Sequence, residues 1–291
     1  MIASTSGSIL EQAVSTEPSL RLSLVHNEPL ERIMFDRNLT GVEFRRACLE
    51  ASRLFIGHLL DEFDPEQSAE LMILSKGIVY QLAEAVAAET GKNLPTNLIA
   101  TSRVSVSGDR VDIEIPYAKF EAPSRTLILG DTVASGATVI AAIGEYRKHH
   151  PVDRVFVLSY AGALVGARRI SEYCRGQGIE ATFLFGLAAF GLADNGFDLS
   201  FLHPATITRD EYRRRAAEQF VGNPVSAVGW DFGSQAMAPQ KYRQLCWIEA
   251  EVWELQGLPC FKVAEQPQEL SLLRHEAAAY SEIAQALGEE L

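Results

Sequence analysis

A short loop between two apolar segments carries the residue types that bind a phosphorylated sugar. The loop runs from Asp131 to Thr138, is rich in small residues, and offers hydroxyl donors at Ser135 and Thr138. Gly136 leaves room for a phosphate to approach backbone N–H groups, and a following helix would add partial positive charge. Asp131 would repel a phosphate, but its carboxylate can accept hydrogen bonds from a sugar diol or hold a metal ion. We therefore expect a site for a phosphate and a polyol together.

The segments on either side predict how this loop is positioned. Thr126 to Leu129 is an apolar run typical of a buried parallel strand, and Val139 to Tyr146 has the composition of a helix. The loop would then lie at the carboxyl end of a strand, where open α/β sheets bind ligands. It lacks both the Gly-Lys-Ser/Thr ending of a P-loop and the Gly-x-Gly-x-x-Gly of a dinucleotide fold. On this motif alone, an ordinary turn of an α/β domain is the alternative.

A second junction of the same kind precedes the loop in the chain. Leu71 to Leu74 is a short apolar run, Ser75-Lys76-Gly77 follows, and a helix is predicted over Ile78 to Thr90. If both junctions face the same edge of the sheet, Lys76 would form a second anion site. The alternative is a lysine on a surface loop.

Two other patterns predict elements around these junctions. Thr40 and Glu43 form a capping box, so a helix should follow. Its apolar face would contain Phe44, Cys48, Ala51, Phe55 and Leu59. Val104 to Val106 and Val111 to Ile115 alternate apolar and polar residues around a Ser-Gly-Asp turn, which predicts a β-hairpin. A hairpin between two core strands is either a lid over a ligand or a decoration, and the pattern favours neither.

Strands and helices alternate through the rest of the core. Strands are predicted over Arg154 to Ser159 and Ala181 to Phe185, with a helix over Leu164 to Arg175 between them. This order implies right-handed βαβ units and a parallel sheet. Gly186 to Pro204 is predicted to be irregular. The helix predicted over Thr208 to Gln219 contains three consecutive arginines, which are usually solvated or face a partner.

Changes in composition divide the chain into three parts. Residues 1–25 are predicted to form an N-terminal arm, residues 26–220 the α/β domain, and residues 221–291 a mainly helical C-terminal extension. All three tryptophans lie in the extension, where aromatic side chains most often serve core or interface packing.

The overall composition narrows the class of protein. A chain of 291 residues with 47% hydrophobic and 22% charged residues is long enough for one sizeable globular domain. Its formal net charge of -12 argues against a nucleic acid or an anionic membrane as the main partner. We find no signal peptide and no apolar run of membrane-spanning length. The four cysteines lack metal-site spacing, so we expect reduced thiols in a cytoplasmic protein. We also expect the protein to form a homodimer.

Several motifs occur in the order found in uracil phosphoribosyltransferases, which belong to the type I phosphoribosyltransferases. The resemblance covers about Glu28 to Pro204. It rests on Ile33 to Phe44, Ile73-Leu74-Ser75-Lys76-Gly77-Ile78, Arg103, Tyr117-Ala118-Lys119, Ser135-Gly136-Ala137-Thr138 and the Gly191 to Phe197 run. The resemblance implies an α/β fold in which a parallel twisted sheet is flanked by helices, with the hairpin as a lid and a helical C-terminal extension.

The resemblance also implies a reaction and a set of site residues. The substrate would be 5-phosphoribosyl 1-pyrophosphate (PRPP) with Mg²⁺, and ribose 5-phosphate would pass to a nucleobase-like or other nitrogen acceptor. Catalysis would depend on Asp131, Lys76, Arg103 and Lys119. PRPP would be held by Ser75, Gly77, Tyr117, Asp131, Thr132, Ala134, Ser135, Gly136, Ala137 and Thr138. The acceptor would contact Phe197, Asp198, Leu199 and Phe201. No residue set is predicted to hold a metal without PRPP.

The chain also departs from that family. Gly130 replaces the first loop acid, Ser75 replaces an arginine, and the base-reading segment that ends at Pro204 lacks the family's glycines and final aspartate. These departures make uracil doubtful as the acceptor and leave two hypotheses. One is a PRPP-dependent transferase, and the other is a regulator that senses PRPP or a nucleotide without catalysis. A general α/β hydrolase or transferase ranks last because no Gly-x-Ser-x-Gly elbow is present.

Overall fold

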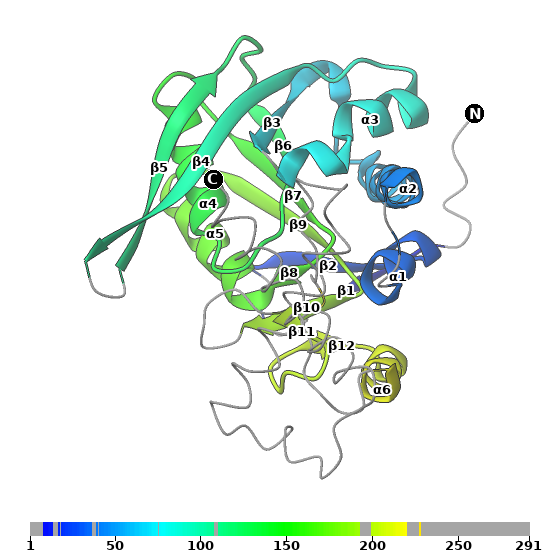
Figure 1. Cartoon of the computed structure of the whole chain (residues 1–291). Helices are drawn as coiled ribbons and strands as arrows, with labels where there is room; N and C mark the ends of the chain where they lie inside the picture. Colours follow the sequence, from blue (N-terminus) through cyan, green and yellow to red (C-terminus); the bar gives the residue numbers. More distant parts are fainter. Residues whose placement is uncertain are drawn as a thin grey trace, which may run out of the picture.

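A mostly parallel sheet forms the centre of the molecule (Figure 1). The computed structural model describes residues 8–13, 17, 19–36, 39, 41–74, 76–107, 110–192, 199–219 and 227, and among them eight strands form this sheet in the order β1-β2-β9-β7-β6-β3-β4-β5. The parallel strands are β2 (Arg21–His26), β9 (Glu180–Gly186), β7 (Arg154–Ser159), β6 (Thr126–Gly130), β3 (Ser68–Leu74) and β4 (Thr96–Ser107). The edges are the antiparallel strands β1 (Ile9–Gln12) and β5 (Arg110–Lys119). The predicted α/β fold with a parallel sheet is confirmed.

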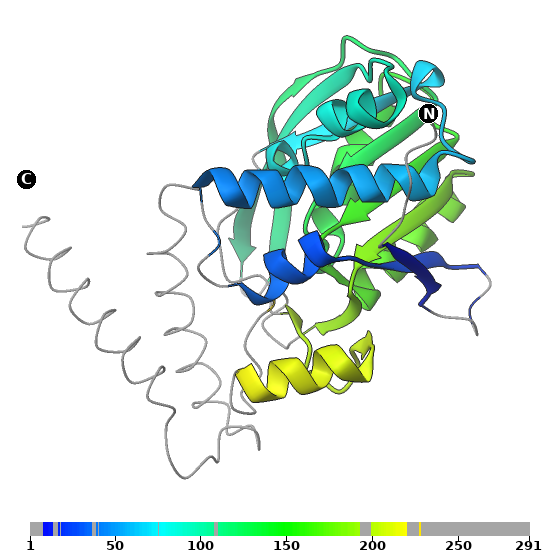
Figure 2. The same ribbon diagram turned by 90° about the vertical axis from the view of Figure 1, so that its right-hand side faces the viewer.

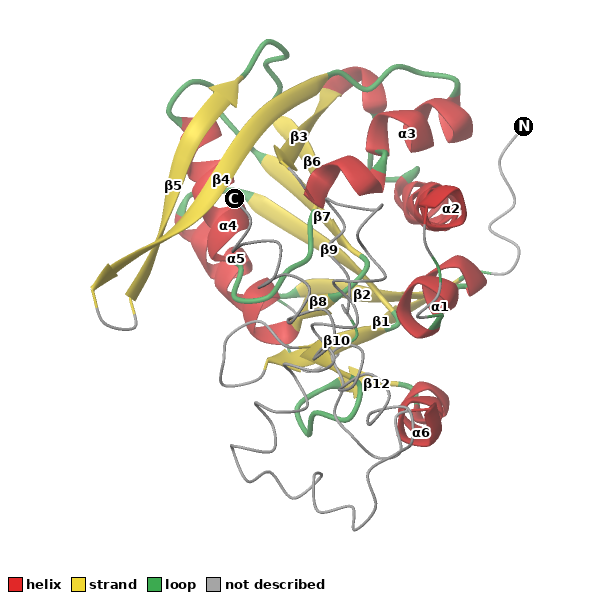
Figure 3. Cartoon of the chain, viewed as in Figure 1, coloured by secondary structure: helices red, strands yellow, loops and turns green. Residues whose placement is uncertain are grey.

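Helices cover both faces of this sheet, as Figure 3 shows by colour. α1 (Glu28–Phe35), α2 (Gly41–Leu59) and α3 (Leu82–Thr90) pack on one face, and α4 (Ala137–Arg147) and α5 (Leu164–Gly176) pack on the other. In β6, Ile128 belongs to the first core while Leu127 and Leu129 belong to the second, because alternate residues of a strand point to opposite faces. Burial on both faces explains why the central strands are almost continuously apolar.

The helix predicted after Thr40 is α2, and its whole predicted apolar face is buried. Thr40 itself lies outside the described residues, so the capping box is not tested. The predicted hairpin is also confirmed, with β4 and β5 paired from Leu98 opposite Lys119 to Ser107 opposite Arg110. Its two arms extend well beyond the other strands (Figure 1).

The path of the chain reverses between β3 and β6. From β3 the chain passes through α3 to β4 and β5 on one side of the sheet. It then returns to β6 on the other side of β3 and continues away through α4, β7, α5 and β9. In open α/β sheets, ligands bind outside the carboxyl ends of the two strands at which such a reversal occurs. The two junctions that the sequence singles out follow these two strands.

Two strands lie within the segment that the sequence predicts as an N-terminal arm, residues 1–25, or at its end. Arg21–His26 is a strand of the main sheet, paired in parallel with β9, and Leu22, Leu24 and Val25 are buried. Ile9–Gln12 adds an exposed edge strand beside it. Leu20, Leu22 and Leu24 recur with a period of two, but this run is short and gives only a weak strand signal.

A small second sheet lies beside the main one, and two of its strands fall within Gly186 to Pro204, which the sequence predicts to be irregular. It contains β8 (Gly162–Ala163), β10 (Ala188–Leu192), β11 (Leu199–Ser200) and β12 (Ile207–Thr208). α6 (Asp210–Gln219) follows and lies beside α1 (Figure 2). Residues 193–198 and, apart from Ala227, the predicted extension from 221 onward lie outside the described residues. Within the described part of the chain, we find no helix with the length and apolarity to traverse a bilayer.

The arginine run of α6 is mostly engaged within the chain rather than simply solvated. Arg213 donates to the carbonyl oxygen of Thr206 at 2.6 Å. Arg215 donates to the Glu31 carboxylate at 2.9 Å and lies 4.2 Å from the centre of the Phe35 ring. These contacts dock α6 on α1.

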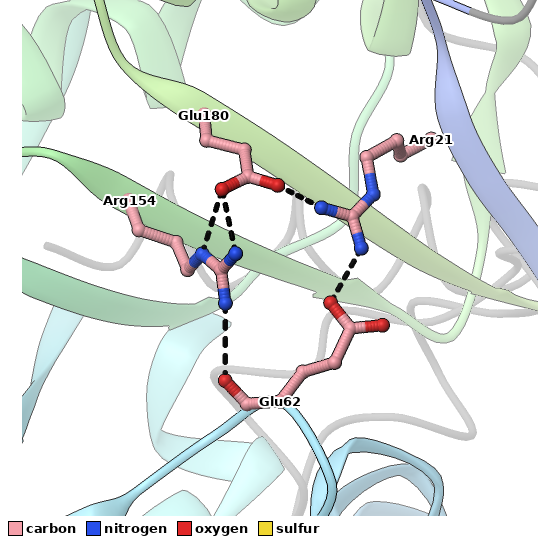
Figure 4. A network of polar contacts seen from close by, with 4 residues as sticks. All are labelled: Arg21, Glu62, Arg154 and Glu180. Carbon is pink, nitrogen blue, oxygen red and sulfur yellow. Dashed lines mark hydrogen bonds and ion pairs between the residues drawn. The ribbon is translucent and has the colours of Figure 1, made fainter.

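Ion pairs join the opposite, amino ends of the strands (Figure 4). Arg21 contacts the carboxylates of Glu62 and Glu180, and Arg154 donates to Glu180 at 2.6 Å and to the carbonyl oxygen of Glu62 at 3.2 Å. A groove at this edge is lined by Glu62, Arg154 and Glu180, among others, and by Thr126, the first residue of β6. Each pair is partly exposed and contributes little alone. The groove lies at the other end of β6 from Asp131, so it is separate from the predicted site.

A buried carboxyl group in β3 makes stability depend on pH. Burial is the main cause that raises the pKa of Glu70 to about 7, although Thr96 Oγ1 donates to its Oε2 at 3.0 Å. This pKa is above the unfolded value of 4.5. The contribution of Glu70 to the free energy of unfolding is therefore fully present below pH 4.5 and is lost as pH rises through 7. Glu70→Gln should therefore raise the free energy of unfolding at pH 8 by about 2 to 3 kcal/mol. Urea melts at pH 8 and pH 4 check this, because the gain should disappear at pH 4; an equal gain at both would contradict it.

Candidate functional site

The loop after β6 begins with a buried acid. Asp131 is 4% exposed, and its Oδ1 accepts a hydrogen bond from the backbone N–H of Thr132 at 2.8 Å. The backbone on this side is fixed to the neighbouring strand, since the N–H of Asp131 donates to Leu158 O at 3.1 Å and that of Val133 to Ala161 O at 3.3 Å. The loop is therefore held in place before any ligand arrives.

The end of the loop leaves the start of α4 open to an anion. Gly136 is the N-cap residue, with φ at +79°, and no side chain caps the helix. The first helical hydrogen bond runs from the N–H of Ile140 to the carbonyl oxygen of Gly136 at 3.0 Å. The N–H groups of the first turn, at Ala137 and Thr138, precede that bond, so they are the groups that a helix offers to an anion. The predicted strand, loop and helix N-terminus are confirmed here.

A second glycine, which sequence analysis missed, supports the loop from α5. A Cβ atom at Gly166 would lie 2.2 Å from the carbonyl oxygen of Ala134, and one at Gly136 would lie 2.8 Å from Gly166 O. The first turn of α5 thus packs directly against the loop. A glycine inside a helical pattern was the available signal, because such a glycine often marks close packing.

The charges of two predicted site residues influence the pKa of Asp131. Burial raises its pKa to about 6, and the charges of Lys76 and Arg103, with the Thr132 N–H, act to lower it. Lys76 comes from the segment after β3, and Arg103 comes from β4 beyond the end of its pairing with β3. The structure therefore brings residues of three chain segments to the carboxyl edge where the chain reverses.

The segment around Lys76 differs from its prediction. The helix predicted from Ile78 is divided into a 3-10 helix, η2 (Lys76–Tyr80), and α3, which begins at Leu82. Gln81 separates them with φ at +48°, and its side-chain amide donates to Arg45 O in α2 at 2.9 Å. Lys76 is therefore the first residue of a 3-10 helix and does not lie at an α-helix N-terminus. Ser75 lies outside the described residues, and Gly77 is buried.

Lys119 and Tyr117 lie on β5, away from the loop in the chain. Lys119 is opposite Leu98 and pairs with Glu121 at 3.0 Å, whereas Tyr117 is opposite Ala100 at the carboxyl edge and is 47% exposed. Among the described residues, the charges that act on Asp131 are those of Lys76 and Arg103 and do not include Lys119.

The two predicted acceptor contacts that the structure describes, Leu199 and Phe201, are both buried. Leu199 is fully buried and Phe201 is 2% exposed, in a cluster where Phe201 stacks on Phe35 with 4.9 Å between ring centres. Both side chains are part of the core and offer no free surface to an acceptor. Phe197 and Asp198 lie outside the described residues.

The space beside Gly130 is filled. A Cβ atom at Gly130 would lie 2.3 Å from Cγ of Tyr80, well inside contact distance. The ring of Tyr80 therefore occupies the position into which a side chain at residue 130 would extend. This leaves Asp131 as the single acid at the end of β6.

Asp131 is the carboxylate that this loop could offer to a divalent cation. Within the described residues, no group of three or more histidine, cysteine, aspartate or glutamate side chains could hold a metal. Mg²⁺ commonly binds through one or two carboxylates together with substrate phosphates. One carboxylate at Asp131 fits a cation that arrives with a phosphorylated ligand.

Comparison with known proteins gives structural matches alone. No family model and no curated protein matches the chain. Similar solved structures include the AQ2163 protein from Aquifex aeolicus, with 16% identity, a TM-score of 0.47, and coverage of 60% of this chain and 91% of that chain. A phosphoribosyltransferase from Corynebacterium diphtheriae matches with 18% identity, a TM-score of 0.34, and coverage of 58% and 98%.

The adenine phosphoribosyl transferase from Trypanosoma brucei is a further match. It was solved in complex with AMP, pyrophosphate and ribose-5-phosphate, and it matches with 13% identity, a TM-score of 0.39, and coverage of 72% of this chain and 99% of that chain. These identities and scores are too low to transfer a function. We therefore base the function on the residues of the site.

Proposed function

We propose that the protein is a PRPP-dependent phosphoribosyltransferase that transfers ribose 5-phosphate to a nitrogen acceptor and releases pyrophosphate. The observation that supports it most is the shared carboxyl edge of β3 and β6, to which a buried acid, two cations and an uncapped helix N-terminus belong. A phosphate, a ribose diol and a pyrophosphate are the three groups that these features would bind. PRPP carries all three.

Each part of the site would have one role in this reaction. The N–H groups of Ala134 to Thr138 and the hydroxyls of Ser135 and Thr138 would hold the 5-phosphate, and Asp131 would accept hydrogen bonds from the ribose hydroxyls. Lys76 and Arg103 would neutralise the charge that develops on the leaving pyrophosphate. Mg²⁺, when bound with PRPP, would supply further charge neutralisation between the phosphate oxygens. The β4–β5 hairpin would close over the site and exclude water.

Binding and turnover test this proposal separately. Calorimetry should detect binding of PRPP in the presence of Mg²⁺. A screen of nucleobases and amines should then find an acceptor that causes pyrophosphate release. The absence of PRPP binding would overturn the proposal.

Lys76→Ala tests the proposal that Lys76 binds the pyrophosphate group of PRPP. Loss of one charged contact should weaken PRPP binding about tenfold or more. It should also raise the pKa of Asp131 above about 6, because the charge of Lys76 acts to lower that pKa. Lys92→Ala is the control, since its ammonium group pairs with Glu66 at 2.7 Å in the 3-10 helix Pro65–Gln67, before β3. If the two substitutions changed the PRPP affinity measured by calorimetry equally, Lys76 would not be a PRPP-binding residue.

A second candidate is a regulator that binds PRPP or a nucleotide without catalysis. The filled space beside Gly130 favours it, because a site with one acid has fewer groups to hold the reacting ribose and its cation. Tight PRPP binding without pyrophosphate release on any acceptor would favour the regulator over the enzyme.

A further inference from the structure

A buried tyrosine links the two halves of the candidate site. Tyr80 is the last residue of η2 and is 1% exposed. Its hydroxyl oxygen accepts a hydrogen bond from the backbone N–H of Tyr160 at 3.0 Å, and it also pairs with the side chain of Ser159. Tyr80 therefore joins the segment that carries Lys76 to the residues at the end of β7.

The same chain of hydrogen bonds continues into the loop that carries Asp131. Ser159 Oγ accepts from the backbone N–H of Val133 at 3.3 Å and donates to the carbonyl oxygen of Ala161 at 2.7 Å. Val133 is two residues after Asp131 and precedes the phosphate-binding end of the loop. A displacement of the Tyr80 hydroxyl would thus alter the positions of both η2 and the Asp131 loop.

Packing fixes the ring of Tyr80 as well as its hydroxyl. The ring stacks on that of Tyr160, with 4.1 Å between centres and 10° between planes. Its other neighbour is Gly130, where a Cβ atom would lie 2.3 Å from Cγ of Tyr80. Because the end of β6 and Tyr160 both confine the ring, η2 can change its distance from the Asp131 loop only if this packing is disturbed.

We propose that Tyr80 is a positioning residue that sets the spacing between η2 and the Asp131 loop. The inference rests on the proposed function, in which these two segments bind opposite ends of PRPP. A ligand that spans both segments depends on their spacing, because its phosphate and pyrophosphate must be held at once. Ribose 5-phosphate contacts the loop alone in this arrangement, so its affinity should depend much less on the spacing.

Tyr80→Phe tests the proposal, because it keeps the ring and removes the hydroxyl. The Tyr160 N–H then loses its acceptor, and η2 loses its connection to Ser159. By calorimetry, the affinity for PRPP should fall about tenfold, while that for ribose 5-phosphate should change less than about twofold. In the protein without ligand, amide hydrogen exchange at Tyr160 and Val133 should become faster.

Tyr146→Phe provides a matched control. Tyr146 is fully buried, and its hydroxyl accepts a hydrogen bond from the backbone N–H of Ser124 at 2.8 Å, just before the amino end of β6. Both substitutions thus remove a buried hydroxyl that accepts from a backbone N–H. A comparable loss of thermal stability is expected in both variants, with loss of PRPP affinity in Tyr80→Phe alone.

The outcomes separate this proposal from the proposed function. Unchanged PRPP affinity in Tyr80→Phe, or an equal loss for both ligands, would overturn the positioning role. If the unsubstituted protein bound no PRPP, the proposed function would fail. Amide hydrogen exchange would then test whether Tyr80 couples η2 to the Asp131 loop. Unchanged exchange at Val133 in Tyr80→Phe would overturn this coupling, and faster exchange would support it.

Discussion

Asp131→Asn should weaken PRPP binding about 100-fold, because it removes the charge of the carboxylate that we propose accepts hydrogen bonds from the ribose hydroxyls. The same substitution should stabilise the fold. Burial raises the pKa of Asp131 from 3.8 to about 6, so the ionised carboxylate at pH 7.5 destabilises the folded protein. Asparagine is neutral and its side-chain oxygen can still accept from the N–H of Thr132. The free energy of unfolding should therefore rise by about 2 to 3 kcal/mol at pH 7.5.

Calorimetry and urea melts check the two parts of this prediction. The gain in stability should diminish as pH falls through 6 and vanish below 3.8, where the carboxyl is protonated in both states. A residue retained for binding at a cost in stability is typical of a functional site. Unchanged ligand affinity with increased stability would show that Asp131 is a buried acid without a binding role.

Gly130→Ala should destabilise the protein by about 3 kcal/mol, because the added methyl group would overlap the ring of Tyr80. Gly130→Asp, which restores an acid at this position, should be destabilised at least as much and gain no turnover. Gly176→Ala is the control: a Cβ atom there meets nothing within 4 Å, and the change should alter stability little. Urea melts of the three variants measure the effect.

A double-mutant cycle identifies Tyr80 as the cause. In a Tyr80→Ala background the ring is absent, so Gly130→Ala should cost much less than it does in the unsubstituted protein. If Gly130→Asp instead folded with normal stability and increased pyrophosphate release, the space beside residue 130 would be open to an acid. The single-acid description of the site would then be wrong.

Local patterns predicted the elements that position the site. Small residues from Asp131 to Thr138, after an apolar run, were enough to predict the strand, loop and helix N-terminus. The five apolar positions of α2 followed from helical spacing alone. These predictions succeeded because each depends on a few neighbouring residues.

The features that sequence analysis missed depend on contacts between distant residues. Gln81 interrupts a helical pattern without glycine or proline, because its side chain bonds to Arg45 O in another helix. Tyr80 beside Gly130, and Gly166 beside Ala134, are close in space but distant in sequence. Phe201 was assigned to an acceptor site, yet its ring packs in the core against Phe35. No local pattern encodes such pairings.

The most direct test of the site is a titration of isotope-labelled protein with PRPP and Mg²⁺, followed by backbone amide chemical shifts. The largest changes should occur at Thr132 to Val139 and at Lys76 to Val79, the segments that follow the carboxyl ends of β6 and β3. No change at either segment, or changes confined to the groove at the amino ends around Arg154 and Glu180, would contradict the proposed site.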